Sequence, residues 1–171
     1  MKESLPYNKE IMKHFRNPKN LGRIKNADAV GEAGNIQCGD VMKIYLKIKD
    51  SKNKLRISDI KGEVFGCIVA IANTSMLTTM AKGKTLEEAL KIDKEELIKK
   101  LGGREKIPPF KIHCSILAAD ALHEAIYNYY KKQNLPIPEE LRKEHERIQK
   151  TLKDIEKRHG DFIKMEREIL K

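Results

Sequence analysis

The chain has 171 residues, 40% of them apolar, and its 35 basic and 25 acidic side chains give a net charge of +10. No apolar run approaches the roughly 18 residues that a membrane span needs, and the first six residues carry no apolar signal segment, so we expect a cytoplasmic protein. Acidic residues are interspersed among the basic ones and no basic run carries interleaved aromatics, which argues against nucleic acid as the ligand.

The first expected elements are a short helix, a loop and an antiparallel hairpin. The helix covers residues 7–15 and ends before Pro18, and the following loop, rich in Gly, Ala and Asn, carries Cys38. Apolar and polar residues alternate from Val41 onward, which predicts a strand with one apolar face. Residues 55–65 return as a second strand, and a slip in their alternation near residues 58–60 predicts a bulge.

Helices are expected after Gly66. Apolar residues at helical spacing predict one helix over residues 67–81 and a long one over residues 115–132. Between them, two capping-box patterns predict two short helices, the second ending at Gly102. Residues 107–111 contain two prolines and are expected to be extended, because proline blocks a helix and biases the residue before it.

Residues 136–171 are expected to form one charged helix, appended to a domain over residues 1–135. Apolar residues recur every seven positions, at Leu141, Ile148, Ile155, Phe162 and Ile169. This stripe permits either a solvated helix packed onto its own domain or a coil that binds itself or a partner. Gly160 is a candidate break in that helix.

The three cysteines, Cys38, Cys67 and Cys114, carry the strongest functional signal. Their odd number and wide spacing favour free thiols over disulfides. Asp40 lies two residues after the first and His113 directly before the third, so three sulfurs and one oxygen or nitrogen can form a four-ligand set for zinc or for an iron–sulfur unit. Two of the cysteines, at positions 67 and 114, fall at expected helix starts, where we expect a lowered thiol pKa.

Each of these features also has a purely structural interpretation. A buried cysteine can serve as a small apolar residue, Asp40 can bond to nearby backbone in a turn, and His113 can cap a helix. Pro108 and Pro109 can simply bend a linker. The flanking of all three cysteines in this manner favours a metal site.

Several stretches of the chain carry a resemblance to a known family. They are Met-Lys-His-Phe-Arg-Asn-Pro-Lys-Asn at 12–20, Cys-Gly-Asp-Val-Met-Lys at 38–43, Phe-Gly-Cys at 65–67, Pro-Pro-Phe-Lys-Ile-His-Cys-Ser-Ile-Leu-Ala at 108–118 and Asp-Ala at 120–121. Over residues 5–133 the chain resembles the IscU/NifU-type iron–sulfur cluster assembly scaffold. The resemblance implies an α+β fold of the SufE/NifU-like kind, a short antiparallel sheet packed against helices, followed here by the C-terminal charged helix.

The resemblance also implies roles for individual residues. The residues expected to hold a nascent [2Fe–2S] cluster, iron or zinc are Cys38, Asp40, Cys67, His113 and Cys114. Among them, Cys114 matches the acceptor of persulfide sulfur from a cysteine desulfurase. The residues that match a segment recognised by a dedicated Hsp70-type chaperone are Ile107, Pro108, Pro109, Phe110 and Lys111.

The predicted function is therefore that of a scaffold, not an enzyme, which assembles [2Fe–2S] clusters and hands them to apoproteins. The alternatives are a zinc-dependent sulfur-transfer protein of the SufU type and a structural zinc-binding interaction module. Within the family, His113 and the short segment between Cys67 and Cys114 favour the IscU branch. The expected partners are the desulfurase, recipient apoproteins, an Hsp70-type chaperone and a second copy of the chain, with neither nucleic acid nor membrane among them.

Overall fold

The computed structural model describes residues 7–35 and 39–169 of the chain, and the side chains of residues 159 and 161–169 fall outside that description. Among the described residues, no helix combines the length and apolar character that a bilayer crossing demands. Cys38, one of the residues expected to bind metal, lies outside the described residues.

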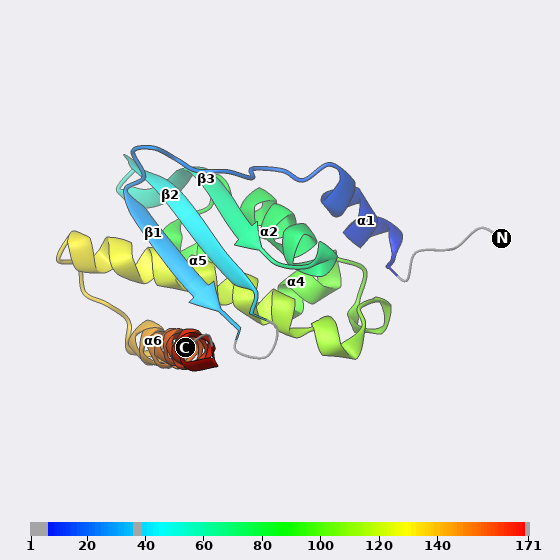
Figure 1. Ribbon diagram of the computed structural model, residues 1–171. Coiled ribbons are helices and arrows are strands. Elements are labelled where there is room, and N and C mark those ends of the chain that lie inside the picture. Colours follow the sequence, from blue (N-terminus) through cyan, green and yellow to red (C-terminus); the bar gives the residue numbers. More distant parts are fainter. Residues whose placement is uncertain (1–6, 36–38, 170–171) are drawn as a thin grey trace.

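Three antiparallel strands form the sheet, in the order β1-β2-β3 (Figure 1). Their bounds are Ala29–Gly34, Val41–Ser51 and Lys54–Phe65. The alternation in β2 places Met42, Ile44 and Leu46 in the core with no exposed surface, while the polar residues between them face the other side. This sheet, covered by helices on one face, confirms the expected α+β class.

Strand β1 corrects the sequence analysis, which placed residues 29–34 in a loop. Its sequence, Ala-Val-Gly-Glu-Ala-Gly, has few large apolar residues because helix α5, His113–Lys132, lies directly on it. A Cβ added to Gly31 would stand 2.1 Å from the backbone nitrogen of Ala125, so no side chain fits there. The small residues that suggested a loop are the ones that this close approach requires.

The β2–β3 hairpin contains the predicted bulge. Lys47 pairs with Asp59 and Ile48 with Ile57, which leaves Ser58 without an opposite residue. The Ser58 hydroxyl donates to the carbonyl of Lys47 at 3.1 Å. The slip in the sequence pattern therefore marked the register shift correctly.

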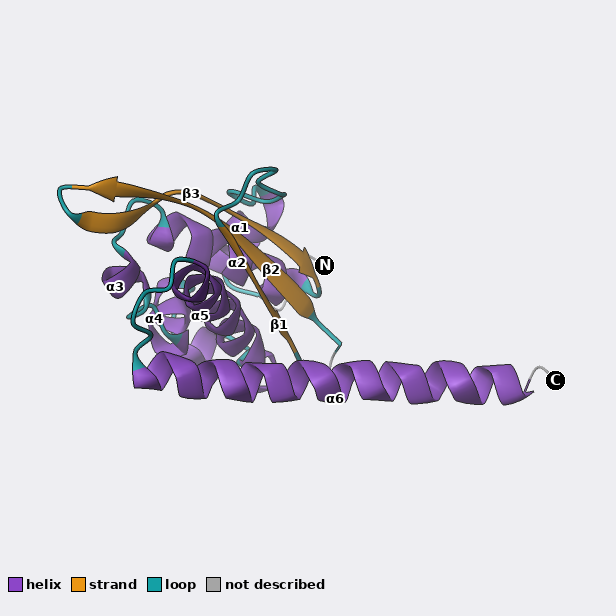
Figure 2. Ribbon diagram, turned by 90° about the vertical axis from the view of Figure 1, so that its left-hand side faces the viewer, coloured by secondary structure: helices purple, strands orange, loops and turns teal. Residues whose placement is uncertain are grey.

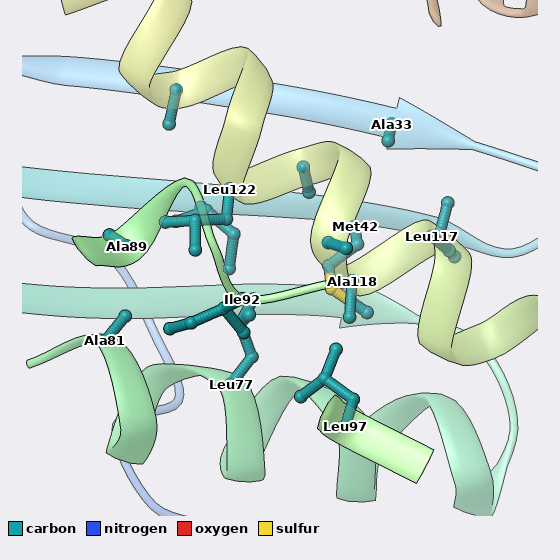
Figure 3. Packing of buried hydrophobic residues seen from close by; sticks show 14 of the residues in the cluster. Ala33, Met42, Leu77, Ala81, Ala89, Ile92, Leu97, Leu117, Ala118 and Leu122 are labelled. Atoms are coloured by element: carbon teal, nitrogen blue, oxygen red, sulfur yellow. The ribbon is translucent and has the colours of Figure 1, made fainter. Parts of the chain in front are cut away.

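Two helices cover one face of the sheet: α2 packs on β3, and α5 packs on β1 and β2 (Figures 1 and 2). The helices of the domain are α1 Lys9–Arg16, α2 Ile68–Ala81, α3 Leu86–Ala89, α4 Lys94–Lys100 and α5 His113–Lys132. Thr85 and Glu88 form a capping box at α3, and Asp93 caps α4, as their spacing predicted. Between sheet and helices lies one apolar core, in which Met42, Leu77, Ile92, Leu97 and Leu122 meet (Figure 3).

The segment before α5 is only partly extended, which corrects a second expectation. Ile107 and Pro108 have extended backbone angles, but Pro109–Lys111 forms a turn of 3-10 helix, η2. Proline is acceptable at the first position of a helical turn, because its fixed φ suits the turn and its missing N–H is not needed there.

Helix α6, Glu139–Ile169, confirms the single C-terminal helix and runs through Gly160 without a break. Its first half packs across α5 and against β1, and its second half extends beyond the body of the molecule (Figure 2). The seam residues Leu141, Ile148 and Ile155 are buried, with at most 8% of their surface exposed. Of the two alternatives for the apolar stripe, packing onto the chain's own domain therefore holds for this half.

Candidate metal centre

The ends of three elements meet at one edge of the sheet and bring three metal-binding side chains together. Asp40 directly precedes β2, Cys67 is the N-cap residue of α2, and Cys114 is the second residue of α5. The sulfurs of Cys67 and Cys114 are 3.7 Å apart, and the Cys114 sulfur lies 3.9 Å from Oδ2 of Asp40. All three ligand atoms lie within 4.8 Å of one another.

These separations match those of ligands around a common metal ion. Two zinc–sulfur bonds of about 2.3 Å at the tetrahedral angle would place the sulfurs about 3.8 Å apart. The observed distance of 3.7 Å between the two cysteine sulfurs is close to that value. The donor set, two cysteine sulfurs and one carboxylate, suits zinc or iron, so little movement of these side chains is needed before a metal is bound.

Asp40 is held firmly although it precedes the strand. Its side chain is buried, with 7% of the residue exposed. A Cβ added to Gly66 would lie 2.9 Å from the Asp40 carboxyl carbon, so the carboxylate rests directly on the backbone before Cys67. On the other side its oxygen faces the Cys114 sulfur. This position makes Asp40 a fixed part of the site.

The two cysteines differ sharply in their protonation. The hydrogen bond from Cys114, helped by backbone N–H groups at the start of α2 and by Lys111, lowers the pKa of Cys67 to about 5. The same bond, together with burial and the charge of Asp40, raises the pKa of Cys114. At neutral pH Cys67 is therefore a thiolate that accepts a hydrogen bond from the Cys114 thiol. The expectation that both helix starts lower a cysteine pKa holds for Cys67 and is wrong for Cys114.

Lys111 supplies the positive charge of the site. Burial alone would lower the pKa of its ammonium group, but interaction with the Cys67 thiolate and with the charges of Cys114 and Asp40 raises it. Its nitrogen also lies 5.8 Å from the centre of the Phe110 ring. The charge of Lys111 therefore balances that of the thiolate.

The structure locates the other expected residues as follows. His113 begins α5 next to Cys114 and lines a neighbouring cavity, but it is not part of the three-residue group of ligand atoms. Its role as a ligand stays a prediction, as does that of Cys38. In the segment 107–111, Ile107 is buried and Phe110 is 71% exposed. This segment leads directly into the first turn of α5, which carries Cys114, and its binding of a chaperone stays a prediction.

Two features near the site were absent from the sequence analysis. Phe65, two residues before Cys67, is 81% exposed, and the alternation of β3 gave no reason to single it out. A cavity of about 280 Å³ lies between the end of β1, the start of α5 and helix α6, and both His113 and Arg147 line it. The approach of α6 to the site could not be read from the sequence, since the heptad stripe says which face is apolar but not what it covers.

The sheet, the helices over it and a group of three side chains that could hold a metal ion define an α+β domain of the type found in cluster scaffolds. The chain belongs to the family of the NifU-like N-terminal domain, whose model matches residues 6–136. Helix α6 lies beyond that match.

Individual relatives agree with this assignment. The iron–sulfur cluster assembly scaffold protein IscU 1 of Archaeoglobus fulgidus is 53% identical over 126 residues, which cover 74% of this chain and 78% of that protein. The scaffold protein IscU of Aquifex aeolicus is 42% identical over 130 residues, covering 76% and 80%. A crystal structure from Fervidobacterium islandicum, described as a scaffold for the SUF system, has a TM-score of 0.59 and 26% identity, and the match covers 71% of this chain and 96% of that one.

Proposed function

We propose that this protein is a scaffold on which iron–sulfur clusters are assembled and from which they are passed to other proteins. The observation that carries the proposal is the convergence of Asp40, Cys67 and Cys114 within 4.8 Å at an edge of the fold, in a chain of the NifU-like family. The relatives named as cluster assembly scaffolds support the same conclusion. In this role the protein is a carrier and not an enzyme, and the cluster is its cargo.

The ligand set suits a cargo that has to leave again. Durable iron–sulfur clusters are held by four cysteine thiolates, whereas this chain has three cysteines in all. We propose that Cys38, Cys67 and Cys114 hold a [2Fe–2S] cluster and that Asp40 or His113 completes the set. A carboxylate oxygen binds iron less durably than a thiolate, so the fourth position is the natural point of release.

We further propose that Cys114 receives sulfur from a cysteine desulfurase. The Cys114 thiolate would attack the outer sulfur of the desulfurase persulfide, forming a sulfur–sulfur bond on the scaffold. The bond to the desulfurase cysteine breaks, and that cysteine leaves as a thiolate. Because the Cys114 thiol is protonated, its proton must first move, and the Cys67 thiolate at 3.7 Å is the base nearest at hand.

Mass spectrometry after incubation with a desulfurase and cysteine tests this assignment of the acceptor. We expect the persulfide on Cys114, and we expect Cys114→Ser to prevent its formation more completely than Cys38→Ser. Persulfide found solely on Cys38 or Cys67 would overturn the assignment. In that case a cysteine other than the buried Cys114 is the entry point for sulfur.

The partners follow from the same proposal: a cysteine desulfurase, apoproteins that receive the cluster, and an Hsp70-type chaperone at residues 107–111. The excess of basic over acidic residues in the chain, 35 against 25, favours acidic surfaces on these partners. The proposed place of action is the cytoplasm, because a reducing compartment keeps the thiols free.

A second function has one specific observation in its favour. The distance of 3.7 Å between the Cys67 and Cys114 sulfurs already suits a zinc ion. Zinc would fix the thiolates for sulfur transfer without any cluster being built. This alternative, of the SufU type, predicts that zinc stays bound during sulfur transfer.

Anaerobic reconstitution with iron and sulfide separates the two functions. For a scaffold we expect the absorption and Mössbauer spectra of a [2Fe–2S] cluster, their loss in Cys67→Ser, and transfer of the cluster to an apo-ferredoxin. Cys67→Ala in parallel excludes substitution by the serine oxygen. A protein that retains zinc, forms no cluster and still accepts persulfide is a zinc-dependent transfer protein instead.

A further inference from the structure

Helix α6 crosses the middle of α5 and continues past the end of strand β1 (Figure 2). Where the two helices cross, His145 bonds to Glu124 at 2.8 Å and Arg147 bonds to Asp120 at 2.6 and 3.0 Å. The last of the buried seam residues, Ile155, lies against Gly34 at the end of β1.

The contact between α6 and β1 is unusually close. A Cβ added to Gly34 would stand 2.7 Å from Cδ1 of Ile155 and 3.3 Å from Cδ2 of Leu152. The two side chains thus rest against bare backbone at the last residue of β1. Because there is no space between these two side chains and the backbone of Gly34, a shift of α6 at this point would also move the end of β1.

The end of β1 is tied in turn to Asp40. The N–H of Asn35 donates to the carbonyl of Asp40 at 2.9 Å, and the N–H of Gly39 donates to the carbonyl of Asn35 at 2.9 Å. The same Cβ position on Gly34 lies 3.8 Å from the Asp40 carbonyl oxygen. Ile155 and Leu152 therefore connect to Asp40 through two residues of backbone.

The other side of Asp40 is occupied by the metal centre. Its carboxylate rests on Gly66 and faces the Cys114 sulfur at 3.9 Å. The aspartate is thus held between α6, through β1, and the two cysteines. A small displacement of the β1 end changes how far its oxygen stands from the metal position.

We propose that α6 positions the metal ligand Asp40, with Ile155 and Leu152 as the positioning residues. The C-terminal helix, which lies outside the family match, then acts on the metal centre as well as stabilising the domain. This inference rests on the proposed role of Asp40 as a ligand in the scaffold. It does not require that the metal be part of a cluster, so zinc alone can test it.

The experiment compares two buried leucine-sized residues of the same helix. Ile155 and Leu141 are 8% and 3% exposed, and alanine removes three carbon atoms from each. Both substitutions should lower the melting temperature to a similar degree, but Leu141 lies in the first turn of α6, about 21 Å along the helix from Ile155 and its contact with Gly34. The dissociation constant for zinc is measured by competition with a chromophoric chelator, at a temperature where every variant is folded.

We expect Ile155→Ala to weaken zinc binding about tenfold, the lower end of the effect of removing an outer partner of a ligand. Leu141→Ala should leave zinc binding unchanged. Asp40→Ala should weaken it at least as much as Ile155→Ala. Adding Ile155→Ala to Asp40→Ala should have no further effect, because the positioned group is then gone.

Three results would overturn the inference. They are an unchanged zinc affinity in Ile155→Ala, an equal loss in Leu141→Ala, and a full additional loss in the double variant. If Ile155→Ala does not fold, Leu152→Ala gives the same test from a half-buried position. Failure of the scaffold proposal is seen separately, as the absence of a cluster when the wild-type protein is reconstituted.

Discussion

The start and the middle of helix α5 both carry buried ionisable groups, but in different surroundings. In the middle, Glu124, 2% exposed, accepts hydrogen bonds from His145 at 2.8 Å and from Gln149 at 2.7 Å. His145 also stacks on Tyr127 with ring centres 3.7 Å apart. At the start, Cys114 faces one thiolate and one carboxylate, a cluster of acceptors and negative charge.

The difference shows how one helix can contribute both to the fold and to the candidate metal site. In the middle of α5, Glu124 and Asp120 accept hydrogen bonds from side chains of α6, and these bonds hold α6 in place. At the start of α5, the Cys67 thiolate and the Asp40 carboxylate lie together with Lys111 as the nearby cation, so a bound metal cation would offset their negative charge.

The strongest test of this contrast removes α6 altogether. A chain ending at residue 137 should lose several kcal/mol of stability, because Leu141, Ile148 and Ile155 each contribute roughly 1.5–3 kcal/mol when fully buried. Cluster assembly should persist, with weaker zinc binding, since the three cysteines remain. Thermal melts, light scattering and reconstitution measure these effects, and loss of assembly in a folded truncated protein would contradict the division at residue 135.

The second test compares the reactivity of the two thiols in the metal-free protein. Cys67, with a pKa of about 5, should react with iodoacetamide at pH 7 more than about tenfold faster than Cys114, whose pKa is raised. The Cys67 rate should fall only as the pH drops through about 5. Cys114→Ala removes the bonded thiol and should shift that fall to higher pH. Peptide mass spectrometry after timed labelling decides, and equal rates would contradict the assigned protonation.

The third test removes the buried carboxylate in the middle of α5. Glu124→Ala leaves His145 and Gln149 without their acceptor and should cost about 1–3 kcal/mol of stability. Urea unfolding measures the loss, and Glu140→Ala, at an exposed position of α6, serves as the control. Cluster retention should be unchanged in both variants. A Glu124 variant that is fully stable but loses its cluster would contradict the structural role proposed for this residue.

The fourth test concerns the fixed carboxylate. Asp40→Ala should lose its cluster more slowly in air than the wild type, by a factor of about three, or under 1 kcal/mol in barrier. The hard oxygen ligand and its charge help water and acceptor proteins to reach the iron, and alanine removes both. Decay of the visible absorption measures the rate. Asp59→Ala, a surface carboxylate paired with Lys82 at 2.8 Å, is the control, and faster decay in the Asp40 variant would refute the role.

The smallest expected effect is on acid stability. The hydrogen bond from His123 lowers the pKa of Glu144, against the effect of burial. Because the folded-state pKa is below the unfolded value of about 4.3, this pair adds stability above that pH and loses it as pH falls through the lowered pKa. Glu144 is 41% exposed, so the gain is under about 1 kcal/mol. In urea unfolding between pH 3 and 6, the free energy of unfolding should depend less steeply on pH for Glu144→Gln than for the wild type. An equal dependence would contradict a contribution of the His123–Glu144 pair to acid stability.

Much of the fold could be predicted because local patterns carried it. The alternation in β2, the capping residues Thr85 and Asp93 and the bulge at Ser58 are all local signals that tertiary packing did not override. Strand β1 was not predicted because its small residues are required by close packing against α5, which lies some ninety residues later in the chain. A pattern within a segment cannot report on a neighbour that far away.

The candidate site divides in the same way. The flanked cysteines predicted the meeting of Asp40, Cys67 and Cys114, since their residue types alone suggest a metal. Which thiol carries the proton could not be predicted, because it depends on the 3.7 Å contact between two sulfurs that only the fold creates. The contact of Ile155 with Gly34 could not be predicted either, because a heptad stripe indicates which face of a helix is buried but not what that face packs against.

The second half of α6, which extends beyond the body of the molecule, limits the directions from which another protein can approach the candidate site. From Ile155, which touches the strand next to Asp40, the backbone of residues 156–169 continues as a straight rod of about 21 Å, at 1.5 Å a residue. The rod extends past the end of β1 (Figure 2). At the other edge of the sheet, where β3 ends, the ring of Phe65 is exposed to solvent. We therefore expect a large protein to be hindered by the helix on the β1 side and to approach on the Phe65 side.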